Sequence, residues 1–286
     1  MHPSQPSLDH HHSQFCLFFL VVIVVCSSRP ASASTYDTTT IVVVSTVHNK
    51  TDNFNVQGLY DIIERVKPDL ILVELDSSFF TSSMSIKPEF VRISVEIEAV
   101  EKYQKAHGIP IRPYDIEGRN TIYQSHNYFK LQKDLSNALN QAVRDSLLGG
   151  ESAMLLEAID RFHDIGRSFG SASPILINSN PCDVAMESKQ DYAGDGMLKI
   201  VTSTPALRQF TELAAFKRDF WKQRNDAMVI NILNWTKLLH PRTILVLSAD
   251  SNTGTACSTV SRSSVLLAHS LKNRGMSSPN VGWHFT

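Results

Sequence analysis

The apolar run Leu70-Ile71-Leu72-Val73-Glu74-Leu75 gives the clearest indication of the fold, because Glu74 is its one polar residue. A short, continuous apolar run predicts a strand that is buried on both faces of a sheet. Lys67-Pro68-Asp69 directly precedes the run and predicts the end of a helix, since the residue before proline is driven away from helical geometry. The run therefore predicts an internal strand that follows a helix.

Three further segments predict strands of the same sheet. Ile41-Val42-Val43-Val44 is β-branched and predicts a buried strand that ends near His48. Ile109–Tyr114 contains two prolines, which suit an edge strand or a strand start. Arg242–Leu247 predicts a fourth strand late in the chain.

Helices are predicted between the first three of these strands. Val56–Val66 and Pro88–His107 both carry apolar residues at helical spacing. Pro88 suits a first helical turn, and Gly108 suits the residue after a helix end. The alternation of strands and helices predicts an α/β fold with a mostly parallel central sheet flanked by helices.

The middle of the chain predicts a helical insertion. His126–Leu148 and Glu151–Phe169 have helical patterns and are separated by two glycines. Ser171–Gly196 contains Ser, Asn, Asp and Gly residues and predicts a loop. Thr204–Leu239 predicts one long helix or two consecutive helices. Its aromatic residues Phe216, Phe220 and Trp221 predict core or the wall of a groove.

The N-terminal residues predict export. Phe15–Cys26 is an apolar run of twelve, which is short for a membrane span of about 20 residues but suits a secretory signal peptide. Ala31-Ser32-Ala33 offers a cleavage site, so residues 1–33 are predicted to be removed and the protein to be secreted. Because the leader lacks Lys and Arg before the run, a membrane anchor through residues 15–26 is the alternative.

Cysteines and glycosylation sequons agree with export. Cys182 and Cys257 remain after cleavage and predict either one disulfide or two buried thiols. Asn49 and Asn234 begin Asn-x-Thr sequons. We favour Asn49, because Asn234 lies in a predicted helix.

Composition excludes two classes of protein. Hydrophobic residues make up 42% of the 286, which is enough for a core and excludes a wholly disordered chain. Lys+Arg number 27 against 28 Asp+Glu, so there is no basic excess for general nucleic-acid binding. Membrane contact is expected only if the leader stays uncleaved.

Titratable residues follow the predicted strands. The carboxyl ends of parallel strands form one edge of a sheet, where ligands of α/β proteins bind. The residues at these ends are His48, Glu74, Asp115, Glu117, Arg119 and Asp250. Each also has a structural interpretation: His48 as a hydrogen-bonded cap, Glu74 as an ion-pair partner of Arg119 or Arg224, and Asp115 and Glu117 as turn residues.

Short motifs in this chain resemble the TraB/GumN/TIKI-type family, as a divergent member. They are Ser45-Thr46-Val47-His48, Val66-Lys67-Pro68-Asp69, Leu72-Val73-Glu74-Leu75-Asp76 and the late Gln223-Arg224-Asn225-Asp226-Ala227-Met228. The resemblance covers residues 40–274 and leaves an irregular tail, 275–286. It implies an α/β fold related to the erythromycin-esterase and haem-binding ChaN groups.

Some members of that family are metal-dependent peptidases, so the resemblance implies a hydrolytic metal site. His48 and Glu74 match the family's metal or catalytic residues. Arg224 and Asn225 match a polar pair that orients the site or stabilises an oxyanion. The metal would activate a water molecule, with Glu74 as ligand or general base.

The chain departs from the family pattern at two places. Ser45 replaces the Gly of the first Gly-x-x-His motif, and Ser248-Ala249-Asp250-Ser251 lacks both the Gly and the His of the second. Hydrolytic sites usually take three protein ligands. His48 and Glu74 with Asp250 or Asp115 would form such a set, and carboxylates favour Mn²⁺ or a similar ion.

Two functions follow from these observations. The first is an exported metal-dependent hydrolase that acts on a peptide or a small molecule. The second is a catalytically degenerate secreted binding protein of the same fold. A haem-binding function by analogy with ChaN has no Cys-x-x-Cys-His motif to support it.

Overall fold

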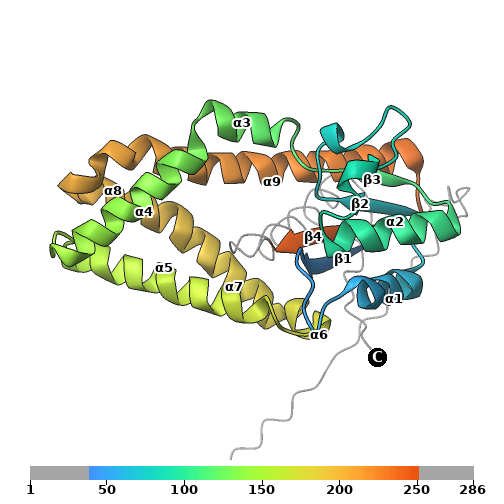
Figure 1. The fold of residues 1–286 in the computed structure, drawn as a ribbon, viewed down its shortest axis with the longest axis horizontal. Coiled ribbons are helices and arrows are strands. Elements are labelled where there is room, and N and C mark those ends of the chain that lie inside the picture. The colour runs from blue at the N-terminus through green and yellow to red at the C-terminus, as the bar shows by residue number, and fades with distance from the viewer. Residues whose placement is uncertain (1–38, 251–286) are drawn as a thin grey trace, which may run out of the picture. The chain divides into compact units, whose positions relative to one another are not determined.

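The computed structural model describes residues 39–250, with side chains described to residue 248 (Figure 1). These residues form four strands and a series of helices, and the sheet confirms the predicted α/β class. The predicted leader, Cys257 and the tail 275–286 lie outside the described residues. Within the described part, no helix has both the length and the apolar composition that a membrane crossing requires.

The sheet is parallel throughout, with strand order β1-β4-β2-β3. Its strands are β1 (Thr40–Val47), β4 (Thr243–Asp250), β2 (Leu70–Val73) and β3 (Ile111–Pro113). The last strand in sequence lies between the first two, and the Pro-containing β3 lies at an edge, as predicted. Because all four strands run the same way, their carboxyl ends share one side of the sheet.

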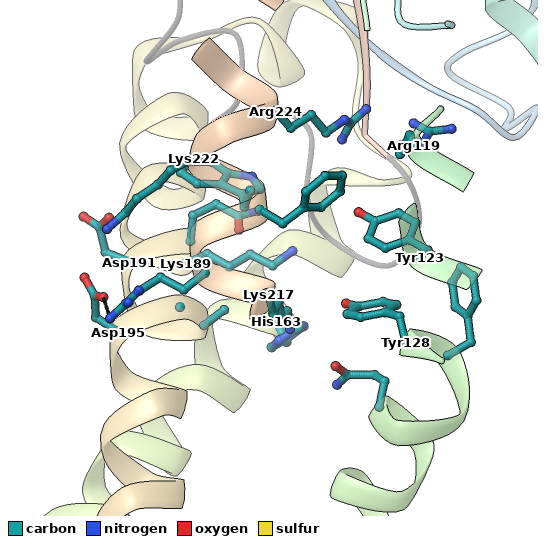
Figure 2. Close-up of a pocket in the computed structure, with 18 of the residues that line it drawn as sticks. Arg119, Tyr123, Tyr128, His163, Lys189, Asp191, Asp195, Lys217, Lys222 and Arg224 are labelled. Carbon is teal, nitrogen blue, oxygen red and sulfur yellow. Dashed lines mark ion pairs between the residues drawn. The ribbon is translucent and has the colours of Figure 1, made fainter. Parts of the chain in front are cut away.

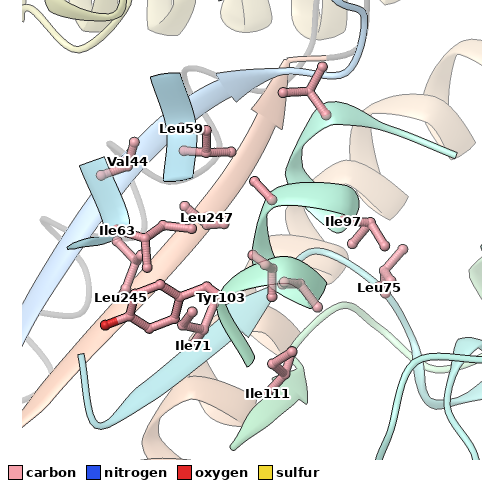
Figure 3. Close-up of a cluster of buried hydrophobic side chains, with 14 of the residues drawn as sticks. Val44, Leu59, Ile63, Ile71, Leu75, Ile97, Tyr103, Ile111, Leu245 and Leu247 are labelled. Carbon is pink, nitrogen blue, oxygen red and sulfur yellow. The ribbon is translucent and has the colours of Figure 1, made fainter. Parts of the chain in front are cut away.

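One face of the sheet packs against α1 (Val56–Val66) and α2 (Val95–His107). Strand residues such as Ile71, Leu245 and Leu247 point to this face (Figure 3). Helix α1 has the predicted bounds, and Lys67 ends it in a left-handed conformation with φ 50°. Gly108 ends α2 at φ 69°, where a residue without Cβ is favoured.

The opposite face packs against α9 (Thr211–Leu239). Leu70 and Leu72 point to this face and are fully buried. Burial of one such side chain contributes about 1.5–3 kcal/mol. Met228 of α9 belongs to the same cluster.

Helix α9 also joins the sheet to the helical insertion. At about 1.5 Å per residue its 29 residues span about 43 Å. Its C-terminal half covers the sheet, and its N-terminal half contributes Leu213 and Ala214 to a second, helical core (Figure 1). The insertion consists of α3 (Arg119–Ser125), α4 (Tyr128–Arg144), α5 (Gly150–Phe169), α6 (Pro174–Ile177), α7 (Asn180–Asp191), a π-helical turn (Tyr192–Gly196), α8 (Met197–Ser203) and a 3-10 helix (Pro205–Phe210).

The predicted loop Ser171–Gly196 is wrong, because most of it is helical. Ser173 caps α6 by accepting a hydrogen bond from the backbone N–H of Leu176, and α7 begins with Pro in its first turn. Polar residues dominate α7 because only a narrow side of it, including Cys182 and Met186, is buried. A short apolar stripe of this kind leaves little periodicity in the sequence.

Two other predicted segments are shorter than expected. Pro88–Phe90 forms a separate 3-10 turn, and α2 begins only at Val95, where the Ser94 hydroxyl caps it. Strand β2 ends at Val73, because the N–H of Leu75 turns back to donate to the Val73 carbonyl. Glu74 therefore lies just beyond the strand end and not within the strand.

Candidate functional site

A cavity of about 530 Å³ lies where the carboxyl side of the sheet faces the helical insertion. His48 and Glu74 line it from the strand ends, and Arg224 lines it from α9. Figure 2 shows Tyr123 and Tyr128 on one side and Lys189, Lys217 and His163 on the other. The structure thus brings the imidazole, carboxylate and guanidinium identified in the sequence to one cavity.

Arg224 forms the centre of a buried ionic network. Its Nη2 donates to Glu74 Oε1 at 2.5 Å and to Asp115 Oδ2 at 2.8 Å, and its Nε donates to Asp115 Oδ1 at 2.7 Å. Arg119 adds a second guanidinium to Asp115 at 2.8 Å, and Ser248 donates to Glu74 Oε2 at 3.0 Å. The structural interpretation of Glu74 as the ion-pair partner of Arg224 matches this geometry.

The charge of Arg224 is secured by its partners. Burial alone would lower the pKa of the guanidinium, but the carboxylates of Glu74 and Asp115 raise it above its ordinary value. A buried network of this kind is costly to disrupt, because removing one member leaves uncompensated charge away from water. The network joins the ends of two strands to α9.

Further side chains of α9 hold the same strand end. Asn231 donates to the backbone carbonyls of Tyr114 and Asp115, and Trp235 donates to the carbonyl of Pro113. Residues 224, 231 and 235 share one helical face, since they are spaced by seven and four. This face of α9 therefore fixes the segment that carries Asp115.

His48 is paired with a residue that the sequence analysis did not identify. Its Nδ1 lies 3.4 Å from the carboxylate of Glu96, a residue of α2 that is only 4% exposed. The Thr46 hydroxyl donates to the same carboxylate at 2.7 Å. Because an ionised carboxylate only accepts, this pairing assigns a hydrogen to Nδ1 and leaves Nε2 for another partner.

The pairing changes the acidity of both groups. Burial by itself would lower the pKa of His48, but the hydrogen bond and negative charge of Glu96, with the charge of Glu74, raise it above its ordinary value. Burial would raise the pKa of Glu96, but His48, Ser94 and Thr46 lower it by hydrogen bonding. The ion pair His48⁺–Glu96⁻ therefore persists to higher pH than an isolated histidine would.

Other predicted site residues lie elsewhere. Glu117 accepts hydrogen bonds from the backbone N–H and hydroxyl of Ser77 and does not line the cavity. Asn225 is 5% exposed and follows Arg224 on α9, but it is not among the residues that line the cavity. The backbone of Asp250 pairs with Val47 in the sheet, and its side chain lies outside the described residues.

The two sequons differ in their surroundings. Asn49 is exposed in the turn that follows β1, whereas Asn234 is exposed on α9. A turn presents an asparagine more openly than a helix does, so the preference for Asn49 stays our prediction. Cys182 is buried in α7, and its predicted disulfide to Cys257 involves a residue outside the described part.

The far wall of the cavity is cationic and aromatic. Lys189 from α7, Lys217 from α9 and His163 from α5 line it together. Burial, then the charges of Lys189 and Lys217, lower the pKa of His163. Phe220 and Trp221 form part of the wall, as the aromatic segment predicted.

Sequence reasoning missed this wall because its members come from separate helices and form no local motif. Lys189 lies in the segment predicted as a loop, and no motif in the sequence singles out Glu96. A signal existed only for Gly166 of α5, since an isolated glycine within a helix indicates close approach of another group. A Cβ at Gly166 would lie 3.0 Å from Lys189 Nζ.

The described side chains do not fit a three-ligand metal site. Glu74 and Asp115 are engaged by guanidiniums, and His48 is engaged by Glu96. Within residues 39–248, no three His, Cys, Asp or Glu side chains come together in an arrangement that would hold a metal ion. Two nearby arginines also oppose a divalent cation by charge.

Comparisons with known proteins leave the family undetermined. No family model matches the chain, and neither the curated proteins nor the solved structures gave a match. The α/β class therefore rests on the sheet and helices of this chain, and the resemblance to the TraB/GumN/TIKI-type family stays a prediction.

Proposed function

We propose that this chain is a secreted ligand-binding protein that keeps a TraB/TIKI-like fold without hydrolytic activity. In this account, the cavity between the sheet edge and the helical insertion holds a small organic ligand or a peptide side chain. The observation that carries the proposal is the ion pair between Glu74 and Arg224. These two residues lie at one end of a cavity that many other side chains line.

The position of Glu74 supports a structural role for this carboxylate. A general base or metal ligand needs a lone pair free for water or metal. Glu74 instead accepts from Arg224 and from Ser248, and its side chain is only 10% exposed. Its role would then be to hold Arg224 and the strand ends in place.

The cavity supports the binding role. Small-molecule sites commonly measure about 300–1,000 Å³ and combine apolar walls with a few polar groups. This cavity falls within that range and is lined by aromatic side chains, among them Tyr123, Tyr128 and Phe220. Tyr123 and Tyr128 stack at a centroid distance of 4.7 Å, which makes one wall flat.

Metal-dependent hydrolysis, which the resemblance implies, is the second candidate. One observation favours it: His48 and Glu74 line the same cavity as Arg224. It requires a third ligand in place of the missing histidine, for which the sequence offers Asp250 or Asp115. We place it second because the described carboxylates are already paired with arginines.

Export belongs to the proposal on sequence grounds. The apolar run Phe15–Cys26 and Ala31-Ser32-Ala33 support a secreted protein, with membrane anchoring as the alternative. The exposure of Asn49 is compatible with glycosylation during export.

Binding can be tested with Prodan, a neutral naphthalene dye whose emission reports an apolar site. Gln132→Trp adds bulk to a residue that lines the cavity, whereas Lys133→Trp adds it to the adjacent exposed residue. We expect saturable dye binding by the wild type and by Lys133→Trp, and at least about tenfold weaker binding by Gln132→Trp. Circular dichroism checks that each variant is folded. Equal dye binding by both variants would contradict the proposal.

A further inference from the structure

The charges that line the cavity are unevenly distributed. Six Lys or Arg side chains line it against three Asp or Glu side chains: Arg119, Lys189, Lys217, Arg218, Lys222 and Arg224 against Glu74, Asp191 and Asp195. Arg224 and Arg119 are neutralised by Glu74 and Asp115, and Arg218 pairs with Asp195 and Asp219. The positive charge that these pairs leave in the lining includes that of Lys217.

Lys217 is the clearest member of this surplus. Among the described residues it forms no ion pair and no hydrogen bond, although it is partly buried in α9. Burial, and then the charge of Lys189, lower its pKa. Two ammonium groups and an imidazole from three helices thus lie near one another in a partly buried place. For Lys217, which has no ion pair among the described residues, such a place is costly unless an anion joins it.

The fold also accommodates Lys189 at a specific place. Its residue is 2% exposed, and its Nζ approaches Gly166 on α5, where any Cβ would lie only 3.0 Å away. The absence of a side chain at Gly166 therefore allows the ammonium group to reach this depth. Figure 2 shows Lys189 and Lys217 directed into the pocket, with the hydroxyl ends of Tyr123 and Tyr128 turned toward them.

The neighbouring wall suits a flat apolar group. Phe220 and Tyr123 line the cavity and meet edge-on at 5.2 Å, and Phe220 also stacks on Phe216 at 5.4 Å with an interplanar angle of 9°. Two buried polar atoms of the lining, Trp221 Nε1 and Gln132 Oε1, have no hydrogen-bond partner among the described residues. Buried polar atoms are usually paired, so a donor and an acceptor are available to a ligand.

We infer that the cavity takes an aromatic anion, an organic ligand with a phosphate or carboxylate beside Lys217, Lys189 and His163 and a planar body against the aromatic wall. This inference rests on the proposed binding function and names its ligand class. Charge-assisted hydrogen bonds to lysine supply the selectivity for the anion. Offset or edge-on ring contacts supply the selectivity for the planar body.

The test is isothermal titration calorimetry of the full chain with five probes. These are phenyl phosphate, benzoate, phenol, benzylammonium and inorganic phosphate. We expect one site for phenyl phosphate or benzoate, at least about tenfold tighter than phenol and than inorganic phosphate, and no measurable binding of benzylammonium. The tighter of the two anions identifies the head group. Phenol binding as tightly as both anions, or inorganic phosphate as tightly as phenyl phosphate, would overturn the inference.

Variants of Lys217 locate the site. Lys217→Met should weaken binding of the preferred anion about tenfold or more, and Lys217→Arg should largely retain it. Lys237→Met removes an exposed lysine from the same helix and should leave binding unchanged. If Lys217→Met fails to fold, the dependence of wild-type binding on salt replaces it, since only an ionic contact weakens as salt rises. Binding unaffected by Lys217→Met, or by salt, contradicts the inference.

The two proposals fail in distinguishable ways. If Gln132→Trp loses Prodan binding but phenol and phenyl phosphate bind with equal affinity, the binding function is supported and the aromatic-anion inference is contradicted. Absence of both Prodan and anion binding removes both proposals.

Discussion

Arg224 Nη2 lies 2.5 Å from Glu74 Oε1, and this contact joins residues 150 positions apart in the chain. Both side chains are only 10% exposed. The contact ties the end of β2 to α9, the helix that spans the sheet and the helical insertion. It also limits the chemistry of the cavity, because a carboxylate that is ion-paired with a guanidinium is poorly suited to bind a metal or to activate water.

Removal of Arg224 should be strongly destabilising. Arg224→Met leaves the carboxylates of Glu74 and Asp115 buried without their main partner, so we expect the free energy of unfolding to fall by about 3–5 kcal/mol. The free energy of unfolding of Arg224→Lys should lie between those of the wild type and Arg224→Met, because lysine keeps the charge but loses the two contacts to Asp115. Urea denaturation measures both changes.

The matched control is an exposed ion pair. Arg161 pairs with Glu157 on the surface of α5. Arg161→Gln should change the free energy of unfolding by no more than about 0.5 kcal/mol. Similar losses of unfolding free energy in Arg161→Gln and Arg224→Met would show that the buried network contributes no more to stability than an exposed ion pair.

The titration of His48 should depend on Glu96. We expect its pKa to lie above the ordinary value of about 6.5 in the wild type and to fall in Glu96→Gln, which keeps an acceptor for Thr46 but removes the charge. Because the folded pKa is raised, the stability from this pair is present below about pH 6.5 and is lost as pH rises through the folded pKa. Histidine proton NMR measures the shift, with His48→Gln for assignment. An unchanged pKa in Glu96→Gln argues against the pairing.

Asn178 should stabilise the edge of the sheet. Its side-chain Oδ1 accepts from the backbone N–H of Ser45 at 2.6 Å, and its Nδ2 donates to the Ser45 carbonyl at 3.0 Å. The amide thus imitates a neighbouring strand beside β1. Asn178→Leu leaves both backbone groups buried and unpaired, which should cost roughly 2 kcal/mol or more in thermal or urea unfolding.

Asn53→Ala is the control for that loss, because Asn53 donates to the backbone of Ser171 in an exposed position nearby. We expect it to change stability by no more than about 0.5 kcal/mol. If Asn178→Leu lowers stability no more than Asn53→Ala does, the contact between Asn178 and Ser45 contributes little to stability.

Two helical glycines should respond differently to alanine. Gly58→Ala in α1 meets its nearest atom at 3.8 Å and should stabilise by about 0.5–1 kcal/mol, the usual gain within a helix. Gly166→Ala should fail to gain, because its Cβ would lie 3.0 Å from Lys189 Nζ and 3.4 Å from Met186 Cε. Equal gains in melting temperature for both would show that Lys189 moves freely.

The strands and helices with strong periodicity could be predicted from the sequence. Helix α1 has the predicted bounds. Strands β2 and β4 form where their apolar runs predicted, because burial on two faces leaves a clear pattern, although β2 ends at Val73 and β4 extends to Asp250. The 171–196 segment could not be predicted, because α7 buries only a narrow side and its polar residues resemble those of a loop.

The candidate site was predictable only in part. Strand ends identified His48, Glu74 and Asp115, because parallel strands gather their carboxyl ends at one edge. Glu96 and Lys217 were not predictable, because Glu96 contacts His48 and Lys217 lines the cavity from helices whose placement depends on tertiary packing. The local sequence pattern does not indicate such contacts between distant segments.

The most direct test of the account is the metal content of the folded full chain. The wild type, His48→Ala and Glu74→Gln are incubated with Mn²⁺, desalted and analysed by inductively coupled plasma mass spectrometry. If the Glu74 carboxylate is held by Arg224 and binds no metal, the wild type and both variants should retain well below one equivalent of metal per chain. One equivalent in the wild type that is lost in both variants would contradict the account and restore the metal-dependent hydrolase.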